Sequence, residues 1–432
     1  MKAKHRVCIR EFGYLIEADS LASNSDLGQI SSTAFAYLRG LIHSGPSNTH
    51  SDSFLKLTTY RKRIALKVQN YVGVLQTPCG TQIEVLPKLY VEGAPDSLEK
   101  TRSQLIKMLR CLKNSPFKHG GFSEIRDARM PLLEVYIAQF LALTNQLVKR
   151  GIRSDYVRQQ SNSQYLKGRL LVSQQIRKNT LHPERFFIDR EEYLVNRPSN
   201  RLIKLALETV KRASQSAANQ KLARELSFAF DDVPVSKDIR ADFQKVRLSR
   251  GMRHYKAVLD WCELLLNGHG PTPSSGNFHS ISLFYPMERV FEDFVAHSLK
   301  NRIEEYFGNG AKLKLQSSKH SLVEEHIGSK IFNLRPDLMI LKGGQPICVL
   351  DTKWKLINSF DRRNKYGISQ ADMYQLYAYG HKYLKDSKQK ELMLIFPMNE
   401  NFYRPLPPFR YEDNFTLNVV PFDLDKGTLV FG

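Results

Sequence analysis

The stretch FNLRPDLMILKGGQPICVLDTKWKL, residues 332–356, contains two short apolar runs on either side of a Lys-Gly-Gly-Gln-Pro turn. This pattern predicts two buried strands joined by a tight connection. Asp337 opens the first run, and Asp351, Thr352 and Lys353 end the second. Burying either kind of charge alone costs several kcal/mol, so these charges need partners.

Side chains on a strand alternate between its two faces, so Asp351 and Lys353 should project from the same side. Thr352 should point the other way, with its carbonyl near the same edge. If the two strands pair, Asp337 meets them at one end of the sheet. Two carboxylates and a carbonyl form a hard oxygen site for Mg²⁺, or Mn²⁺, rather than zinc. The plain alternative is a solvated strand end with a surface ion pair.

Such a site suits the hydrolysis of a phosphodiester. The metal would polarise a phosphate oxygen and lower the pKa of a bound water. Lys353 would orient that water or neutralise charge that develops on the phosphate. The charges in the quoted stretch are then tolerated because a cation and a phosphate complete them.

The charge balance points to a polyanionic partner. The 432 residues include 64 Lys and Arg against 43 Asp and Glu, which gives a net charge of +21. Nucleic acid is the simplest partner for this excess, and an acidic membrane surface is the competing one. No segment approaches about 20 uninterrupted apolar residues, and the N-terminus lacks a long apolar stretch of the signal-peptide type. We therefore expect a soluble, cytoplasmic protein with no membrane partner.

The chain reads as an α+β multidomain protein. Residues 1–120 are expected to form a β-rich N-terminal region, because TYRKRIALKVQNYVGVLQTPCGTQIEVLPKL alternates apolar and polar residues between turn signals. Residues 121–275 read as a mainly helical middle domain. The Gly-, Pro- and Ser-rich stretch at residues 268–280 is the best boundary. Residues 276–432 alternate helical and strand patterns, as an α/β domain would.

A Pro-Asp pair, thirteen intervening residues and then Asp-Thr-Lys resemble the signature of the PD-(D/E)XK nucleases. The resemblance implies a restriction-endonuclease-like fold for the C-terminal domain. It also implies a helix-borne glutamate at the metal, for which Glu292 is favoured and Glu288, one turn earlier, is the alternative. Downstream, Gln375 and Tyr379 match a Gln-x-x-x-Tyr element of several such nucleases. Four residues apart on a helix, they share a face that would line the cleft.

Several further segments, in order from about residue 70 to residue 380, resemble the McrC-type subunit of modification-dependent restriction systems. They are YVGVLQTPCGTQIEVLPKL, YLKGRLL, EEYLVNRPSNRLIKLAL and RGMRHYKAVLDWCELLL. The resemblance implies a DNA endonuclease subunit that docks on a hexameric AAA+ GTPase and stimulates its hydrolysis. That partner would read modified DNA and translocate it. This division of labour fits the sequence, because no GxxxxGK[ST] phosphate loop occurs and this chain itself should bind no nucleotide.

A basic cluster in the middle segment offers a second contact with DNA. Arg250 and Arg253 lie beside Tyr255 and would grip phosphate, or they form an ordinary solvated face. Two rival functions stay open at this point. One is a stand-alone PD-(D/E)XK nuclease of repair or defence, and the other is an activator of an AAA+ hexamer that does not cut.

Overall fold

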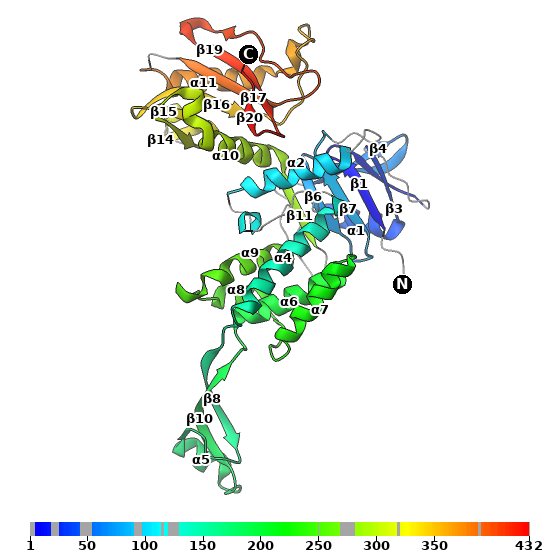
Figure 1. Cartoon of the computed structure of the whole chain (residues 1–432), viewed down its shortest axis with the longest axis vertical. Helices are drawn as coiled ribbons and strands as arrows, with labels where there is room; N and C mark the ends of the chain where they lie inside the picture. Colours follow the sequence, from blue (N-terminus) through cyan, green and yellow to red (C-terminus); the bar gives the residue numbers. More distant parts are fainter. Residues whose placement is uncertain are drawn as a thin grey trace.

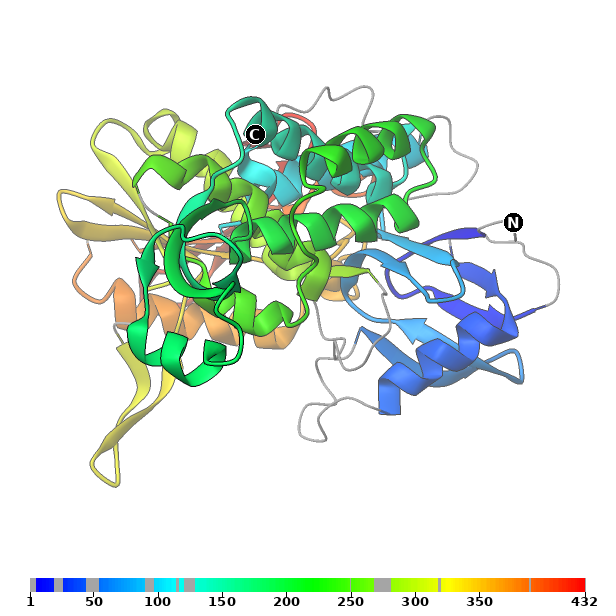
Figure 2. The same cartoon turned by 90° about the horizontal axis from the view of Figure 1, so that it is seen from below.

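The computed structural model describes residues 5–18, 26–43, 54–89, 97–113, 116–119, 129–248, 250–267, 281–317, 320–387 and 390–431. These residues form a mixed α/β structure with several sheets. Figure 1 shows its long axis, with the C-terminal sheet at one end and a narrow projecting segment of the middle region at the other. In Figure 2 the blue N-terminal strands and the yellow to orange C-terminal elements lie on opposite sides, with green helices in front.

Two four-stranded sheets build the N-terminal part, as the alternating sequence predicts. Their orders are β1-β7-β6-β11 and β3-β2-β5-β4. The strands are β1 (Arg6–Arg10), β2 (Tyr14–Glu17), β3 (Leu27–Ile30), β4 (Leu55–Tyr60), β5 (Arg63–Val68), β6 (Tyr71–Gln76), β7 (Gln82–Leu86) and β11 (Ser282–Pro286). Helix α1 (Ser32–His43) shares one apolar core with both sheets. The described residues up to 86 are rich in strand, whereas Ser97–Cys111 and Pro116–His119, within the same expected region 1–120, form helices. The division at residue 120 stays a prediction.

Strand β11 belongs to a different part of the structure from the one that its position in the sequence suggests. It follows the proposed boundary at residue 276, yet it pairs antiparallel with β6 in the N-terminal sheet. Gly73 of β6 has a φ of 142°, and a Cβ there would lie 1.9 Å from the carbonyl oxygen of Leu283, so the pairing requires glycine. The stretch 268–280, which we expected to be the boundary, lies outside the described residues.

The middle region is largely helical, but a small sheet interrupts it. The helices are α2 (Ser97–Cys111), η1 (Pro116–His119), α4 (Leu132–Lys149), α6 (Pro198–Ala213), α7 (Ala217–Ala229), α8 (Ile239–Lys245), η2 (Arg250–Met252) and α9 (Arg253–Asn267). Between α4 and α6 the chain forms β8 (Asp155–Ser163), β9 (Arg169–Leu170), α5 (Val172–Asn179) and β10 (Phe186–Leu194). The three strands pair in the order β8-β10-β9 and form the projecting segment of Figure 1. The helical periodicity of the flanking residues did not indicate this sheet.

The C-terminal part is a seven-stranded mixed sheet in the order β12-β15-β16-β17-β19-β18, with β20 paired to β19. Its strands are β12 (Ala311–Leu315), β15 (Leu338–Lys342), β16 (Gln345–Thr352), β17 (Glu391–Pro397), β18 (Phe409–Arg410), β19 (Thr416–Asp423) and β20 (Thr428–Leu429). A separate hairpin is formed by β13 (His320–His326) and β14 (Ser329–Leu334). Helices α10 (Met287–Phe307) and α11 (Gln370–Tyr383), with η3 (Lys365–Gly367) and η4 (Glu412–Asn414), complete it. The expected hairpin is confirmed, since β15 and β16 pair antiparallel.

Two helices cover opposite faces of this sheet, and the alternation along its strands decides which side chain meets which helix. On β16, Cys348 and Leu350 belong to the core shared with α10. Val349 belongs to the core shared with Leu376 of α11. Asp351 and Lys353 continue the second series, because they lie two and four residues beyond Val349. The sheet therefore presents both charges on the α11 side.

Among the described residues, no helix is both long and apolar enough to cross a membrane.

A buried ion pair ties α2 to the N-terminal sheet and provides a stability test. Nε of Arg102 lies 2.6 Å from a carboxylate oxygen of Glu84, and both side chains are almost fully buried. Arg102→Met should lower the local opening free energy of β7 by about 3–5 kcal/mol, because it leaves a buried charge uncompensated. Native-state hydrogen exchange of the β6 and β7 amides measures this loss.

The double variant Arg102→Met/Glu84→Leu is the control for this test. It removes both charges, so most of the lost protection should return. Equal losses in the single and double variants would contradict the electrostatic explanation.

Candidate functional site

An ion pair at the end of β16 is the centre of the candidate site. Nζ of Lys353 lies 2.6 Å from Oδ2 of Asp351, and the Asp351 side chain is only 1% exposed. The other oxygen, Oδ1, has no hydrogen-bond partner among the described residues. The two side chains lie on the same face, as the strand period predicts. Burying a carboxylate whose oxygen has no hydrogen-bond partner lowers the stability of the fold, unless a further positive group binds it.

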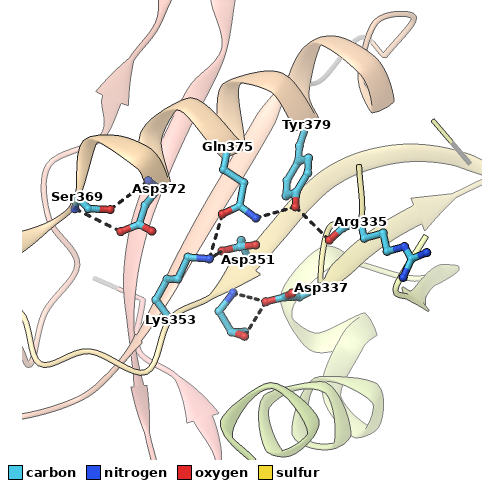
Figure 3. A network of polar contacts seen from close by, with 9 residues as sticks. Arg335, Asp337, Asp351, Lys353, Ser369, Asp372, Gln375 and Tyr379 are labelled. Carbon is cyan, nitrogen blue, oxygen red and sulfur yellow. Dashed lines mark hydrogen bonds and ion pairs between the residues drawn. The ribbon is translucent and has the colours of Figure 1, made fainter. Parts of the chain in front are cut away.

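Helix α11 supplies the next contacts of this pair. Nζ of Lys353 donates a hydrogen bond to Oε1 of Gln375 at 3.1 Å, and Nε2 of Gln375 donates to the hydroxyl of Tyr379 at 2.7 Å. That hydroxyl donates to the carbonyl oxygen of Arg335 at 3.1 Å. Figure 3 shows this series of hydrogen bonds, which runs from Lys353 through α11 to the segment before β15. The expected common face for Gln375 and Tyr379 is confirmed.

Asp337 lies beside the end of β16. Its Oδ2 accepts hydrogen bonds from the backbone N–H and the hydroxyl of Thr352, both at 2.8 Å. These two bonds orient the Asp337 carboxylate relative to the strand that carries Asp351. The strand pairing thus brings together two carboxylates that are fourteen positions apart in the sequence.

The structure distinguishes the two candidate glutamates of α10. Glu292 is half-buried, and its Oε1 accepts a hydrogen bond from Nε2 of Gln316 at 2.9 Å. Burial, followed by the charge of Asp337, raises the pKa of Glu292. Glu288 is exposed and interacts electrostatically with Glu11 and Lys88. Of the two, Glu292 is therefore the one that faces Asp337.

The acidic groups of the site repel one another. Burial is the main cause that raises the pKa of Asp351 to about 7, and the Asp337 carboxylate raises it further. Burial lowers the pKa of Lys353, but the carboxylates of Asp351, Asp337 and Asp372 together raise it above its ordinary value. Lys353 is thus a firmly protonated cation among several carboxylates. One lysine does not balance Asp337, Asp351 and Glu292.

A hard divalent cation matches this imbalance and the oxygen donors present. Its candidate ligands are the carboxylates of Asp337 and Asp351 and the carbonyl of Thr352. Within the described ranges, no three His, Cys, Asp or Glu side chains are grouped so that they would bind one ion. We expected one ion to touch at least two of the carboxylates of Asp337, Asp351 and Glu292, and this stays a prediction. Gln316 connects the two acidic residues Glu292 and Asp337, because its side chain donates to Glu292 and its backbone N–H donates to the carbonyl oxygen of Asp337 at 2.9 Å.

The basic residues singled out in the middle region lie away from these carboxylates. Arg253 begins α9, which packs with α4 and α6 and is distant from the C-terminal sheet in Figure 1. The side chain of Arg250 lies outside the described part of the structure. The candidate site and the basic cluster are thus two separate places on the molecule.

One neighbour of the site was missed in the sequence. Asp372 forms a capping box with Ser369 at the start of α11, and its charge acts on both Asp351 and Lys353. The Ser-x-x-Asp spacing that precedes the helix is a recognisable start signal. It fixes the first turn of the helix that carries Gln375.

The raised pKa of Asp351 leads to a test of stability. Its pKa of about 7 exceeds the ordinary value of 3.8, so the folded state binds the Asp351 proton more tightly than the unfolded state does. The stability of the metal-free protein should therefore fall as the pH rises from about 4 through 7. Asp351→Asn should remove this loss and raise stability at pH 8, by at most a few kcal/mol at about 1.4 kcal/mol per pKa unit.

Thermal unfolding in a chelator at pH 5 and pH 8 measures the effect. The exposed Asp386 offers the control Asp386→Asn, which should leave the pH dependence unchanged. Parallel pH dependences for the wild type and Asp351→Asn would refute the assignment of this titration to Asp351.

Two solved structures are similar to the whole chain or most of it. The first is a chain of a refined half-complex from a tetradecameric assembly of Thermococcus gammatolerans McrB AAA+ hexamers with bound McrC. It is 18% identical over 99% of this chain and 96% of that chain, with a TM-score of 0.68. The second, from a cryo-EM structure of the Thermococcus gammatolerans McrBC complex, is 20% identical. It covers 69% of this chain and 88% of that chain, with a TM-score of 0.50.

No curated protein matches the sequence. A family model does match it, over residues 66–397, and its description is McrBC 5-methylcytosine restriction system component. The match covers the N-terminal strands from β5 onward, the helical middle and the candidate site. Because it includes most of the chain, the protein belongs to the family of McrBC 5-methylcytosine restriction system components.

Proposed function

We propose that this protein is the DNA-cutting subunit of a McrBC-type restriction system. It hydrolyses phosphodiester bonds in DNA that carries modified cytosine, with Mg²⁺ or Mn²⁺ as cofactor. The observation that carries this proposal is the buried Asp351–Lys353 pair, 2.6 Å apart, with Asp337 fixed beside it. A carboxylate pair next to a lysine at the end of a buried strand is the arrangement that the PD-(D/E)XK signature requires.

The C-terminal fold supports the same conclusion. A mixed sheet with parallel central strands β16, β17 and β19 is covered by α10 on one face and α11 on the other. We assign it as a restriction-endonuclease-like domain that begins at α10. Strand β11, which precedes α10 directly, remains with the N-terminal sheet.

The bound ion would polarise the scissile phosphate and supply an activated water. Asp337, Asp351 and the carbonyl of Thr352 would hold the ion, and Glu292, whose pKa the Asp337 charge raises, would add a carboxylate nearby. Lys353 stays protonated and stabilises negative charge on the phosphate. Gln375 and Tyr379 fix the Lys353 ammonium by the hydrogen bonds described above.

The partner we propose is an AAA+ hexamer of the McrB type that hydrolyses GTP. One chain that this protein resembles comes from an assembly of McrB AAA+ hexamers with bound McrC. The projecting segment of β8, β9, β10 and α5 supports docking, because it carries exposed apolar side chains. These are Tyr156, Tyr165, Leu166, Val172, Ile176, Leu181 and Tyr193. We propose this segment as a contact surface in addition to the N-terminal region of residues 1–120.

A basic pocket in the helical middle supports DNA binding away from the cutting site. Arg150, Arg253, His254 and Lys256 line a pocket of about 410 Å³ between α4 and α9. The charges of Arg150 and Arg153 contribute to the lowered pKa of His254, after burial, so the cations lie close together. With a net charge of +21, the chain suits a DNA backbone that is held by its phosphates.

Loss of either member of the central pair should abolish cleavage. Lys353→Met removes the cation that stabilises the phosphate, and Asp351→Asn removes an ion ligand. We expect each to lower the cleavage rate by at least about 10²-fold, the magnitude found when a single preorganised electrostatic contact is deleted. Cleavage of modified DNA in Mg²⁺, in the presence of the partner, measures the loss.

The matched control is Lys342→Met. Lys342 is an exposed lysine at the opposite end of β15 from Asp337, and its loss should leave the rate unchanged. Retention of full cutting by both site variants would move the active site elsewhere or favour an activator that does not cut.

The dependence on a partner distinguishes the restriction subunit from a stand-alone nuclease. Efficient cleavage should require the cognate AAA+ protein with its nucleotide, and this chain should raise the hydrolysis rate of that protein. Assays of cleavage and hydrolysis with each component omitted in turn measure both effects. Tyr156→Ser/Tyr193→Ser, at two exposed rings 5.0 Å apart, should weaken the stimulation. Cutting at the full rate by this chain alone, with hydrolysis unchanged, would establish the rival function.

A further inference from the structure

Trp354 follows Lys353 directly in the sequence, and two residues of the N-terminal region hold it. Its indole N–H donates a hydrogen bond to Oε1 of Glu11 at 2.6 Å. Its carbonyl oxygen accepts a hydrogen bond from Nζ of Lys88 at 2.6 Å. The same Lys88 ammonium lies 5.2 Å from the centre of the indole ring. Trp354 is therefore fixed at its backbone and at its side chain by residues more than 260 positions away.

Glu11 and Lys88 are themselves placed by the N-terminal sheet. They follow β1 and β7, which are neighbouring parallel strands. The backbone N–H of Glu11 donates to the carbonyl of Leu86 at 2.9 Å, and the backbone N–H of Lys88 donates to Oε1 of Glu11 at 2.8 Å. We call Glu11, Lys88 and Trp354 the tryptophan latch.

The latch contacts both elements that carry the candidate metal-site residues. On one side, the backbone N–H of Lys353 is still bonded to the carbonyl of Ile395 in β17 at 2.9 Å, so Trp354 is the first residue beyond the sheet. On the other side, its ring lies 5.3 Å from the ring of Phe291 on α10. Phe291 precedes Glu292. A shift of the indole would therefore displace the backbone next to Lys353 and the Phe291 ring next to Glu292.

The chemistry of the latch is unusual for a contact that only adds stability. Glu11 is 1% exposed, and its Oε2 has no hydrogen-bond partner in the described residues. Burial raises the pKa of Glu11 and lowers that of Lys88, so the folded state carries a desolvation cost at both groups. Apolar residues of similar size would often be as stable at such a place. What the charged groups add is direction, because their hydrogen bonds fix where the indole and its carbonyl lie.

We propose that Glu11 and Lys88 are positioning residues for the nuclease site, which they align by holding Trp354. The proposal rests on the proposed function, since it assigns a role in DNA cleavage. The N-terminal region would thereby influence the site. A displacement of the ends of β1 and β7 would move Trp354, and Trp354 is covalently joined to Lys353.

Two substitutions of Glu11 separate alignment from simple stability. Glu11→Leu removes the acceptor of the indole N–H, whereas Glu11→Gln keeps an oxygen in its place. In the complex with the AAA+ partner, Glu11→Leu should lower kcat for cleavage by about 10- to 100-fold, as a small misplacement of reacting groups does. KM for DNA and the stimulation of the partner should stay unchanged. Glu11→Gln should retain most of the activity. The control Glu305→Leu, at an exposed glutamate near the end of α10, should retain all of it.

A second measurement follows the latch without any assay of cleavage. The chain contains two tryptophans, Trp261 and Trp354, so protein labelled with 5-fluorotryptophan gives two ¹⁹F resonances, which Trp354→Phe assigns. In Glu11→Leu the Trp354 resonance should move while that of Trp261, buried in the helical core, stays in place. Lys88→Met should move the same resonance.

The outcomes separate this proposal from the nuclease assignment. A moved Trp354 resonance with unchanged kcat overturns the positioning role and leaves the nuclease function standing. An unmoved resonance, or equal losses of kcat in Glu11→Gln and Glu11→Leu, also overturns it. A wild-type complex that cuts no DNA overturns the nuclease function and the positioning role together.

Discussion

The burial of Asp351 is the constraint on which the C-terminal part depends. A carboxylate that is 1% exposed at the end of a central strand needs compensation, and the surrounding elements supply it in part. Lys353 provides the nearest charge, and Gln375 of α11 orients that charge. Because burial and Asp337 still raise the pKa of Asp351, the compensation is incomplete without a cation. The fold thus keeps an electrostatic deficit at the place where a divalent ion and a phosphate are proposed to meet.

The parts of the fold that the sequence predicted are those whose signal is local. The apolar runs of β15 and β16, the turn between them and the helical periods of α10 and α11 are all contained in short windows. Alternation along β16 was enough to put Asp351 and Lys353 on one side, and the spacing of Gln375 and Tyr379 was enough to put them on one helix face. In the candidate site, the alternation of side chains along β16, the spacing on α11 and the pairing of β15 with β16 determine most of the arrangement around Lys353.

The parts that were not predicted depend on contacts between distant segments. Strand β11 looks like the start of the C-terminal domain by position, yet Gly73 leaves room for it on the N-terminal sheet. The β8-β10-β9 sheet has largely exposed faces, so its strands lack the strict apolar alternation of a buried sheet. The sequence near Glu292 gives no sign of Gln316, which is hydrogen-bonded both to Glu292 and to the backbone of Asp337. The contact between Gln316 and Glu292 joins segments 24 positions apart, so no local pattern could indicate it.

Trp354 shows how the two kinds of information combine. Its place after Lys353 is visible in the sequence, but its partners Glu11 and Lys88 become visible only when β1 and β7 are paired. Seen with those partners, the strand end has two chemically different sides. Towards α11, Lys353 faces the carboxylates and remains charged. Towards the N-terminal sheet, the next residue is held by groups whose charges are costly to bury. If the proposed partner docks on the N-terminal region, it acts on Glu11 and Lys88, whose hydrogen bonds to Trp354 connect them to the strand end that carries Asp351 and Lys353. These bonds would link the proposed docking to the proposed cleavage.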